Sequence, residues 1–187
     1  DWDKLKRRRQ QHRIEGYTLL TIQVDGELSE VIDLFVKINS TGKALSAAEK
    51  GTIVFGTLHP NNASKTVDRI ISVFPAGEQD GIRNVLGETL RAAVAQQLLP
   101  KIGGGRVAAI EILLSSPAIG NMIREGKTTM ITSAIQTGVK DGMIDMDSSI
   151  RRLYDEKKIS ARAAIDKAID KSQFKDLLEE GAAPGAH

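Results

Sequence analysis

The residue best placed to do chemistry in this 187-residue chain is His59, which closes the segment GTIVFGTLH. The apolar run at 53–58 is short and rich in β-branched and aromatic residues, and it is bounded by glycine and proline, a pattern typical of a buried strand. Asn61 and Asn62 follow as candidate N-cap residues of a helix. A side chain between a strand end and a helix N-terminus lies where open α/β sheets bind ligands. Spacing alone, however, favours a histidine that caps a helix or packs in a core.

The segment after His59 predicts an amphipathic helix from 63 to 74, which Pro75 ends. Its apolar stripe recurs at i, i+3, i+4 and i+7 and consists of Val67, Ile70, Ile71 and Phe74. Arg69 lies on the same helix. Its position suits a contact with phosphate or with another subunit, and equally an ordinary ion pair with Asp68 or Asp80.

The chain contains no phosphate-binding loop of the kind that an NTPase requires. That loop has the pattern G-x-x-x-x-G-K-[ST] between a strand and a helix. Residues 42–44 read GKA, and residues 126–128 read GKT but have Asn121 where the first glycine belongs. Because the loop binds phosphate through backbone amides in a defined conformation, we expect neither segment to hold a nucleotide.

The remaining periodicities predict a chain that is mostly helical by residue count, with two further strand regions. We expect a strand at 18–24, a β-hairpin at 98–114, helices at 31–38, 80–97, 118–125 and 128–137, and a helical bundle at 145–172. Few partners are available for the strand at 53–58, so we expect its edges to be poorly covered except where 18–24 pairs with it.

The composition of the chain excludes several classes of protein and of binding site. Apolar residues make up 41% and charged residues 27%, as in globular proteins. The net charge of +2 does not indicate a polyanionic partner, and the basic run at 4–13 is typical of solvated surface, so we do not expect nucleic acid as a partner. The absence of cysteine excludes disulfides and thiolate metal sites, and no metal site is predicted. No apolar run approaches the ~20 residues that span a bilayer.

Residues 51–174 resemble the C-terminal part of the type IV pilus retraction motors, the PilT/PilU branch of the secretion ATPases. The resemblance rests on GTIVFGTLH, ASKTVDRI, GIRNVLGETLRAAVAQQLLP, GRVAAIEILLSSPAIGNMIREGK and GMIDMDSSIRRLY, in the family's order. It implies an α/β fold: the C-terminal half of a RecA-like P-loop NTPase with a helical C-terminal bundle. It also implies ATP and Mg²⁺ as cofactors, a cytoplasmic homo-hexamer peripheral to the inner membrane, and a pilus platform protein as partner.

The resemblance also implies functional residues. His59 corresponds to the second histidine of the family's His box, which lies near the γ-phosphate, whereas Thr52 replaces the first. Thr57 and Arg69 are implied nucleotide-binding or interface residues. The family's retraction motif A-I-R-N-L-I-R-E has its counterpart in Ala118, Ile119, Asn121, Ile123, Arg124 and Glu125, with Gly120 at the first arginine. Because the P-loop and Walker B carboxylate are missing, we expect this chain alone to be inactive and to bind no nucleotide tightly.

Residues 1–50 resemble a different family, the ParB-like nuclease domain of GmrSD-type restriction proteins, through INSTGKALSAAE. That family's catalytic D-G-Q-Q-R motif is missing. A capping box at 46–49 predicts a helix from Ala47, yet a strand pattern follows at once. We therefore interpret the chain as two segments of separate origin, 1–50 and 51–174, with a disordered tail at 175–187. Deleting 1–50 should then leave the thermal midpoint almost unchanged.

Three functions follow from these patterns. The first is a portion of a pilus retraction ATPase that drives twitching motility. The second is a remnant of a DNA-modification-dependent restriction nuclease. The third is a helical interaction module without enzymatic activity.

Overall fold

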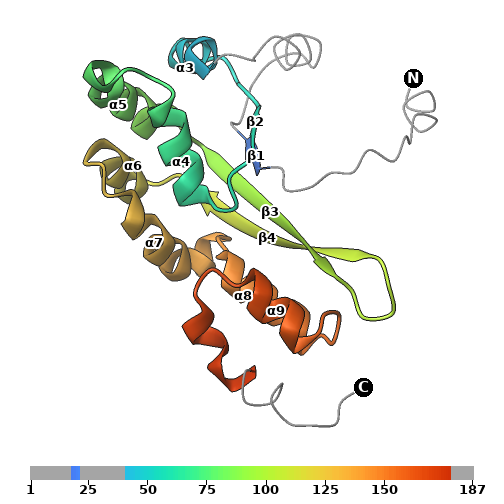
Figure 1. Cartoon of the computed structure of the whole chain (residues 1–187). Helices are drawn as coiled ribbons and strands as arrows, with labels where there is room; N and C mark the ends of the chain where they lie inside the picture. Colours follow the sequence, from blue (N-terminus) through green and yellow to red (C-terminus); the bar gives the residue numbers. More distant parts are fainter. Residues whose placement is uncertain (1–17, 22–40, 178–187) are drawn as a thin grey trace, which may run out of the picture.

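The computed structural model describes residues 18–21 and 41–177, and a long antiparallel hairpin runs through it (Figure 1). The hairpin consists of β3 (Ala92–Pro100) and β4 (Arg106–Leu114), paired from Ala92 with Leu114 to Pro100 with Arg106. Two short strands, β1 (Thr18–Thr21) and β2 (Gly56–Leu58), extend the sheet in the order β2-β1-β3-β4, and every neighbouring pair is antiparallel.

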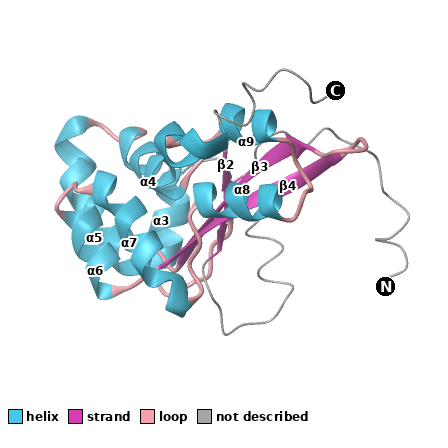
Figure 2. Cartoon of the chain, turned by 90° about the horizontal axis from the view of Figure 1, so that it is seen from below, coloured by secondary structure: helices cyan, strands magenta, loops and turns pink. Residues whose placement is uncertain are grey.

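Helices make up most of the rest of the described chain and gather along one side of the hairpin (Figures 1 and 2). The α-helices are α3 (Thr41–Glu49), α4 (Ala63–Ser72), α5 (Gln79–Thr89), α6 (Pro117–Arg124), α7 (Ile131–Thr137), α8 (Met146–Asp155) and α9 (Ala161–Lys167). The 3-10 turns are η1 (Ala76–Glu78), η2 (Thr128–Met130), η3 (Gly138–Asp141) and η4 (Lys171–Phe174). Within the described residues, no helix is long and apolar enough to cross a bilayer.

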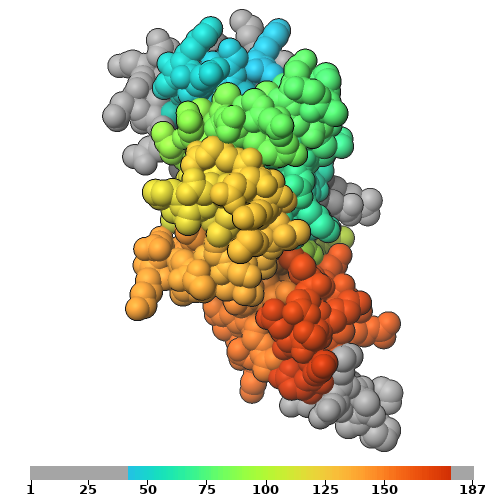
Figure 3. All heavy atoms as spheres, turned by 90° about the vertical axis from the view of Figure 1, so that its left-hand side faces the viewer, coloured from blue at the N-terminus to red at the C-terminus, as the bar shows by residue number. Residues whose placement is uncertain are grey.

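Two hydrophobic cores lie along the hairpin, which contributes to both. The first core packs α3 to α7 against the sheet around Val67, Leu86, Leu113 and Ile123. The second packs α8, α9 and η4 against the hairpin around Leu99. This succession of packed elements gives the elongated outline of Figure 3, from α3 and α5 at one end to α8 and α9 at the other.

Several predicted elements are confirmed. Helices occur at α4, α6 and α7, and the predicted C-terminal bundle corresponds to α8, α9 and η4. Thr18–Thr21 pairs with β2 as expected, whereas the rest of the predicted strand at 18–24 and the predicted helix at 31–38 lie outside the described residues. The predicted strand at 53–58 is shorter than expected, because Ile53 and Val54 are buried but precede the ladder.

The predicted helix at 80–97 is wrong beyond Thr89. The helix ends there, and the chain enters β3 at Ala92. Ala93, Ala95 and Leu99 are fully buried, and β3 pairs with β4 along its whole length and with β1 at residues 92–94. This pairing satisfies the backbone groups of β3, so tertiary context overrides the helical preference of an alanine- and leucine-rich segment.

The helix predicted to begin at Ala47 is also wrong, because α3 begins at Thr41 and the capping-box segment forms its last turn. Gly51 has a φ of 83° and its N–H donates to the carbonyl of Ala48, a left-handed turn that ends the helix. Leu45 is buried in the first core. The described part of residues 1–50 therefore belongs to the same packed unit as the residues that follow it.

The predicted disordered tail begins too early. Leu177 is only 1% exposed and belongs to the second core. Asp176 forms a 2.6 Å ion pair with Arg151 of α8. Residues 175–177 are therefore part of the folded unit, and the prediction for 178–187 lies outside the described residues.

Candidate functional site

The position of His59 agrees with the prediction from sequence. It follows β2 directly and precedes α4 by four residues. Asn62 is the N-cap residue: its Oδ1 accepts a 2.8 Å hydrogen bond from the N–H of Lys65. Its carbonyl accepts from both the N–H and the hydroxyl of Thr66. These bonds fix the start of α4. His59 is exposed and lies on the short segment between β2 and this helix start.

His59 lines a surface hollow of ≈ 690 Å³ between its own segment, the hairpin and the end of α9. The described residues that line it are His59, Asn61, Gln96, Gln97, Leu98, Pro100, Arg106 and Lys167. Thr57 and Arg69, the other two implied nucleotide or interface residues, are exposed but do not line this hollow. The structure thus brings His59 together with Arg106 and Lys167, which no sequence pattern groups.

Behind the His59 segment, the carboxylate of Glu111 joins the N-termini of two helices. Glu111 lies on β4 and is 2% exposed. One oxygen accepts a 2.6 Å hydrogen bond from the N–H of Ala63, the first residue of α4. The other accepts at 3.1 Å from the N–H of Met146, the first residue of α8. A negative group at two helix N-termini is electrostatically favourable, and it connects the first core to the second.

Burial and hydrogen bonding shift the pKa of Glu111 in opposite directions. Desolvation raises its pKa above the ordinary 4.5, the two backbone hydrogen bonds oppose that rise, and the nearby charges of Asp145 and Asp147 add to it. Sequence reasoning missed this residue. The available signal was a lone acid in the otherwise apolar run VAAIEILL, since an acid buried in a strand requires partners.

The other acids of this region also have structural partners. Asp145 caps α8 by accepting from the N–H and the hydroxyl of Ser148 at 3.0 Å and 2.6 Å. Asp147 accepts from the N–H groups of Ile169 and Asp170 at 2.7 Å and 2.8 Å. Among the residues that the structure describes, no group of histidine, cysteine or acidic side chains is arranged to hold a metal ion.

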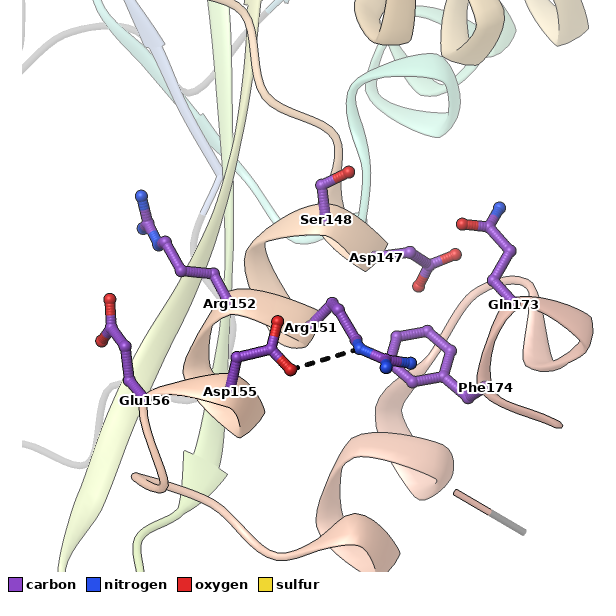
Figure 4. A pocket seen from close by; sticks show the side chains of 8 residues that line it. All are labelled: Asp147, Ser148, Arg151, Arg152, Asp155, Glu156, Gln173 and Phe174. Carbon is purple, nitrogen blue, oxygen red and sulfur yellow. Dashed lines mark ion pairs between the residues drawn. The ribbon is translucent and has the colours of Figure 1, made fainter. Parts of the chain in front are cut away.

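A further hollow lies between α8 and η4 (Figure 4). Arg151 reaches across it: Nε is 3.4 Å from a carboxylate oxygen of Asp155, and Nη2 is 2.6 Å from one of Asp176. Phe174, which is buried, also lines the hollow (Figure 4). These ion pairs balance the positive charge of Arg151 and connect the C-terminal turn to α8. We therefore interpret this hollow as a packing contact.

The residues predicted to form a retraction motif lie on α6 and at its C-cap residue, Glu125, and they differ in burial. Ile119 and Ile123 are fully buried in the first core. Ala118, Asn121 and Glu125 are exposed, and Arg124 is half-buried. Arg124 donates a hydrogen bond to the side chain of Asn121, and Glu125 pairs with Lys127 at 2.7 Å. Two of the six residues therefore have a packing role, and the other four are at least partly exposed.

Gly120, which lies within the predicted motif, is at the contact between α5 and α6. A Cβ atom at Gly120 would be 2.6 Å from the carbonyl oxygen of Gly87, and a Cβ at Gly87 would be 2.8 Å from that of Gly120. Any side chain at either position would push backbone against backbone. The glycine is therefore required by the packing of the two helices.

We expect Gly120→Ala to lower the free energy of unfolding by about 1–3 kcal/mol through this overpacking. Gly81→Ala, in α5, is the matched control because a Cβ there meets nothing within 4 Å. That control should be neutral or stabilise by up to ~1 kcal/mol, since alanine is the better helix former. Urea unfolding of both variants measures the difference, and equal stability of the two variants would contradict the steric explanation.

The arrangement of hairpin and helices is the α/β fold of the secretion ATPases, as two solved structures show. The pilus retraction motor PilT with bound ADP matches with a TM-score of 0.66 and 38% identity, over 75% of this chain and 39% of that one. The ATPase DotB of Legionella pneumophila matches with a TM-score of 0.56 and 26% identity, over 76% and 36%. These matches confirm the predicted fold class.

Curated relatives point to the same group of proteins. A twitching motility protein of Neisseria gonorrhoeae is 52% identical over 124 residues, which are 66% of this chain and 33% of the relative. The type IV pilus retraction ATPase PilT of Pseudomonas aeruginosa is 50% identical over 125 residues, 67% and 36%. No family model matches the chain. The chain is thus homologous to part of the type IV pilus ATPases and spans about a third of the length of these relatives.

Proposed function

We propose that residues 51–174 are the C-terminal portion of a type IV pilus retraction ATPase, which couples ATP hydrolysis to pilus disassembly in twitching motility. The observation that supports this most directly is the placement of His59. It directly follows a strand and precedes a capped helix in a fold shared with a motor whose structure contains bound ADP. In this proposal His59 senses the nucleotide and passes its state to α4.

The proposal assigns roles to the exposed residues. Thr57 and Arg69 contact the nucleotide or a neighbouring subunit of a cytoplasmic homo-hexamer at the inner membrane. The exposed face of α6, with Asn121, Arg124 and Glu125, acts in retraction toward the pilus platform protein. ATP and Mg²⁺ are the cofactors of the assembled motor. Because the 187 residues contain no P-loop motif, we expect this chain alone to turn over no ATP above background.

A segment exchange tests the function. Residues 51–174 replace the matching segment of PilT from Pseudomonas aeruginosa, and ATP turnover and twitching of the hybrid are measured beside the isolated chain. We expect the hybrid to retain both activities and the isolated chain to have neither. His59→Ala in the hybrid should lower turnover at least about tenfold, the scale expected for losing a polar group near the reacting phosphate.

Asn84→Ala is the matched control in the hybrid, because Asn84 is an exposed polar residue of α5 away from the hollow. It should leave turnover unchanged. A hybrid that forms hexamers and binds nucleotide, but neither hydrolyses ATP nor supports twitching, would refute the proposed function. Full turnover after His59→Ala would refute only the role of the histidine.

We further propose that residues 1–50 and 51–174 have separate origins. The nuclease-like pattern INSTGKALSAAE supports this, while the missing D-G-Q-Q-R motif argues against nuclease activity. The burial of Leu45 means that any such joining has produced a shared core. Sequencing genomic DNA across codons 45 to 55 in independent isolates tests the proposal. If the two segments were joined in the organism, an uninterrupted reading frame must cross this region in every isolate.

A further inference from the structure

The turn between β3 and β4 forms a tip that projects beyond the helices (Figures 1 and 2). The tip consists of residues 101–105, with the sequence KIGGG. Ile102 is 56% exposed there, whereas Ile159 in the neighbouring loop is 1% exposed. The three glycines have φ values of 84°, 101° and 76°, and a Cβ on any of them would meet nothing within 4 Å. The tip thus presents glycine backbone and the side chain of Ile102 to solvent.

Backbone hydrogen bonds hold the tip in a defined shape. The N–H of Lys101 donates to the carbonyl of Gly105 at 3.1 Å, and the N–H of Gly104 donates to the carbonyl of Lys101 at 3.1 Å. The N–H of Ile102 donates at 2.9 Å to the carbonyl of Lys158, in the loop between α8 and α9. Because these amides already have acceptors, moving the tip toward an apolar phase costs less than it would for an open loop.

Positive charge surrounds the base of the tip. Lys101 and Arg106 lie at the two ends of the turn, and Lys157 and Lys158 lie in the adjoining loop between α8 and α9. All four side chains are exposed. Glu156 is also exposed and pairs with Lys158 at 2.6 Å. Four cations and one acid give these five residues a net charge of +3, so the surface around Ile102 attracts anions.

An exposed apolar side chain above a cluster of cations is suited to the boundary layer of an anionic bilayer. The apolar group enters between the headgroups, and the cations lie beside the lipid phosphates. We propose that this tip docks on anionic lipid, with Ile102 inserted and Lys101 and Lys157 at the headgroups. The proposal goes beyond the proposed function and does not rest on it, because it uses none of the residues assigned to ATP hydrolysis or retraction.

A fluorescent label at the tip tests the insertion. The chain has no cysteine, so Ile102→Cys in the full chain accepts a single apolar NBD group in place of the isoleucine side chain. Vesicles of equal parts phosphatidylglycerol and phosphatidylcholine should raise the NBD emission at least about twofold and shift it to the blue. Vesicles of phosphatidylcholine alone should cause no change, because they offer the cations no net negative charge.

Val139→Cys, labelled in the same way, is the matched control. Val139 is 62% exposed but is followed by Lys140 and Asp141, whose charges cancel, so we expect no response with either kind of vesicle. The basic run at 4–13 can also attract the chain to anionic vesicles. The decisive result is therefore which label enters the bilayer, rather than whether the chain binds.

Charge variants of the tip-labelled chain test the attraction. Lys101→Glu should weaken the apparent lipid affinity about tenfold or more, because it replaces an attractive charge by a repulsive one and each contributes about fivefold at an anionic surface. Lys43→Glu makes the same change at an exposed position of α3, at the other end of the molecule (Figure 3), and should weaken it by less than about twofold. Circular dichroism checks that both variants fold.

Four results would overturn the proposal. They are no response of the tip label to anionic vesicles, an equal response of the label at position 139, and equal weakening by Lys43→Glu. The fourth is a response of the tip label to soluble polyglutamate as large as its response to vesicles, which would assign the tip to an acidic protein surface instead.

Discussion

Glu111→Ala should lower the free energy of unfolding by about 3–5 kcal/mol. The substitution leaves the buried N–H groups of Ala63 and Met146 without the acceptors they now have at 2.6 Å and 3.1 Å. Each unsatisfied buried donor costs about 1–3 kcal/mol, and the lost side-chain volume adds a cavity. Urea unfolding followed by circular dichroism measures the loss.

Glu88→Ala is the control, because Glu88 is exposed on α5 and its replacement should stay within about 0.5 kcal/mol of the parent. Hydrogen exchange supplies a second measurement. In the Glu111 variant the first amides of α4 and α8 should lose protection together, because one carboxylate serves both helices. A loss of less than 1 kcal/mol in the free energy of unfolding, or faster exchange at only one helix, would contradict the interpretation that Glu111 stabilises both helix N-termini.

Glu111 also makes the free energy of unfolding depend on pH, in a direction that its raised pKa determines. Because burial raises the pKa of Glu111 above the ordinary 4.5, the folded state binds more protons than the unfolded state just above that pH. The contribution of this group to stability is therefore fully present below about pH 4.5 and declines as the pH rises through the raised pKa. Glu111→Gln abolishes this titration and replaces one carboxylate oxygen by an amide group that donates. Because the parent protein is more stable at the lower pH, the free energy of unfolding lost on this substitution should be larger at pH 4 than at pH 7.5.

Deleting residues 1–50 should lower the thermal midpoint of the remaining chain by about 6 °C or more, contrary to the expectation from sequence. The deletion removes β1, which lies between β2 and β3, and so leaves β2 without its partner. It also removes Leu45 from the first core, and burial of such a side chain contributes about 1.5–3 kcal/mol. A loss of ~3 kcal/mol corresponds to roughly 6–12 °C in a protein of this size.

Point variants separate the two contributions. Leu45→Ala in the full chain should cost about 2–4 kcal/mol as a large-to-small core substitution. Lys43→Ala, at an exposed position of the same helix, should change stability by less than about 0.5 kcal/mol. A truncated chain with an unchanged midpoint in differential scanning calorimetry would mean that α3 and β1 contribute nothing to the fold.

Local patterns sufficed for the elements whose stabilising interactions are close in sequence. The stripe of Val67, Ile70 and Ile71 predicts α4, and all three residues are buried as expected. Side-chain caps at Asn62 and Ser160 lie within three residues of the N–H groups they accept from, so the sequence alone reveals them. The same local order places His59 between strand and helix, and the family resemblance carried by these segments predicted the fold class.

Contacts between distant residues decided the rest. Residues 92–97 have helical periodicity, yet they form a strand, because β4 pairs with all of them and β1 pairs with residues 92–94. Other contacts join residues more than thirty positions apart. Gly87 packs against Gly120, and Glu111 accepts hydrogen bonds from Ala63 and Met146. Likewise, the meeting of His59 with Arg106 and Lys167 depends on how the hairpin and α9 pack. Periodicity and capping signals record only interactions within a few residues along the chain, so these features exist only in the tertiary structure.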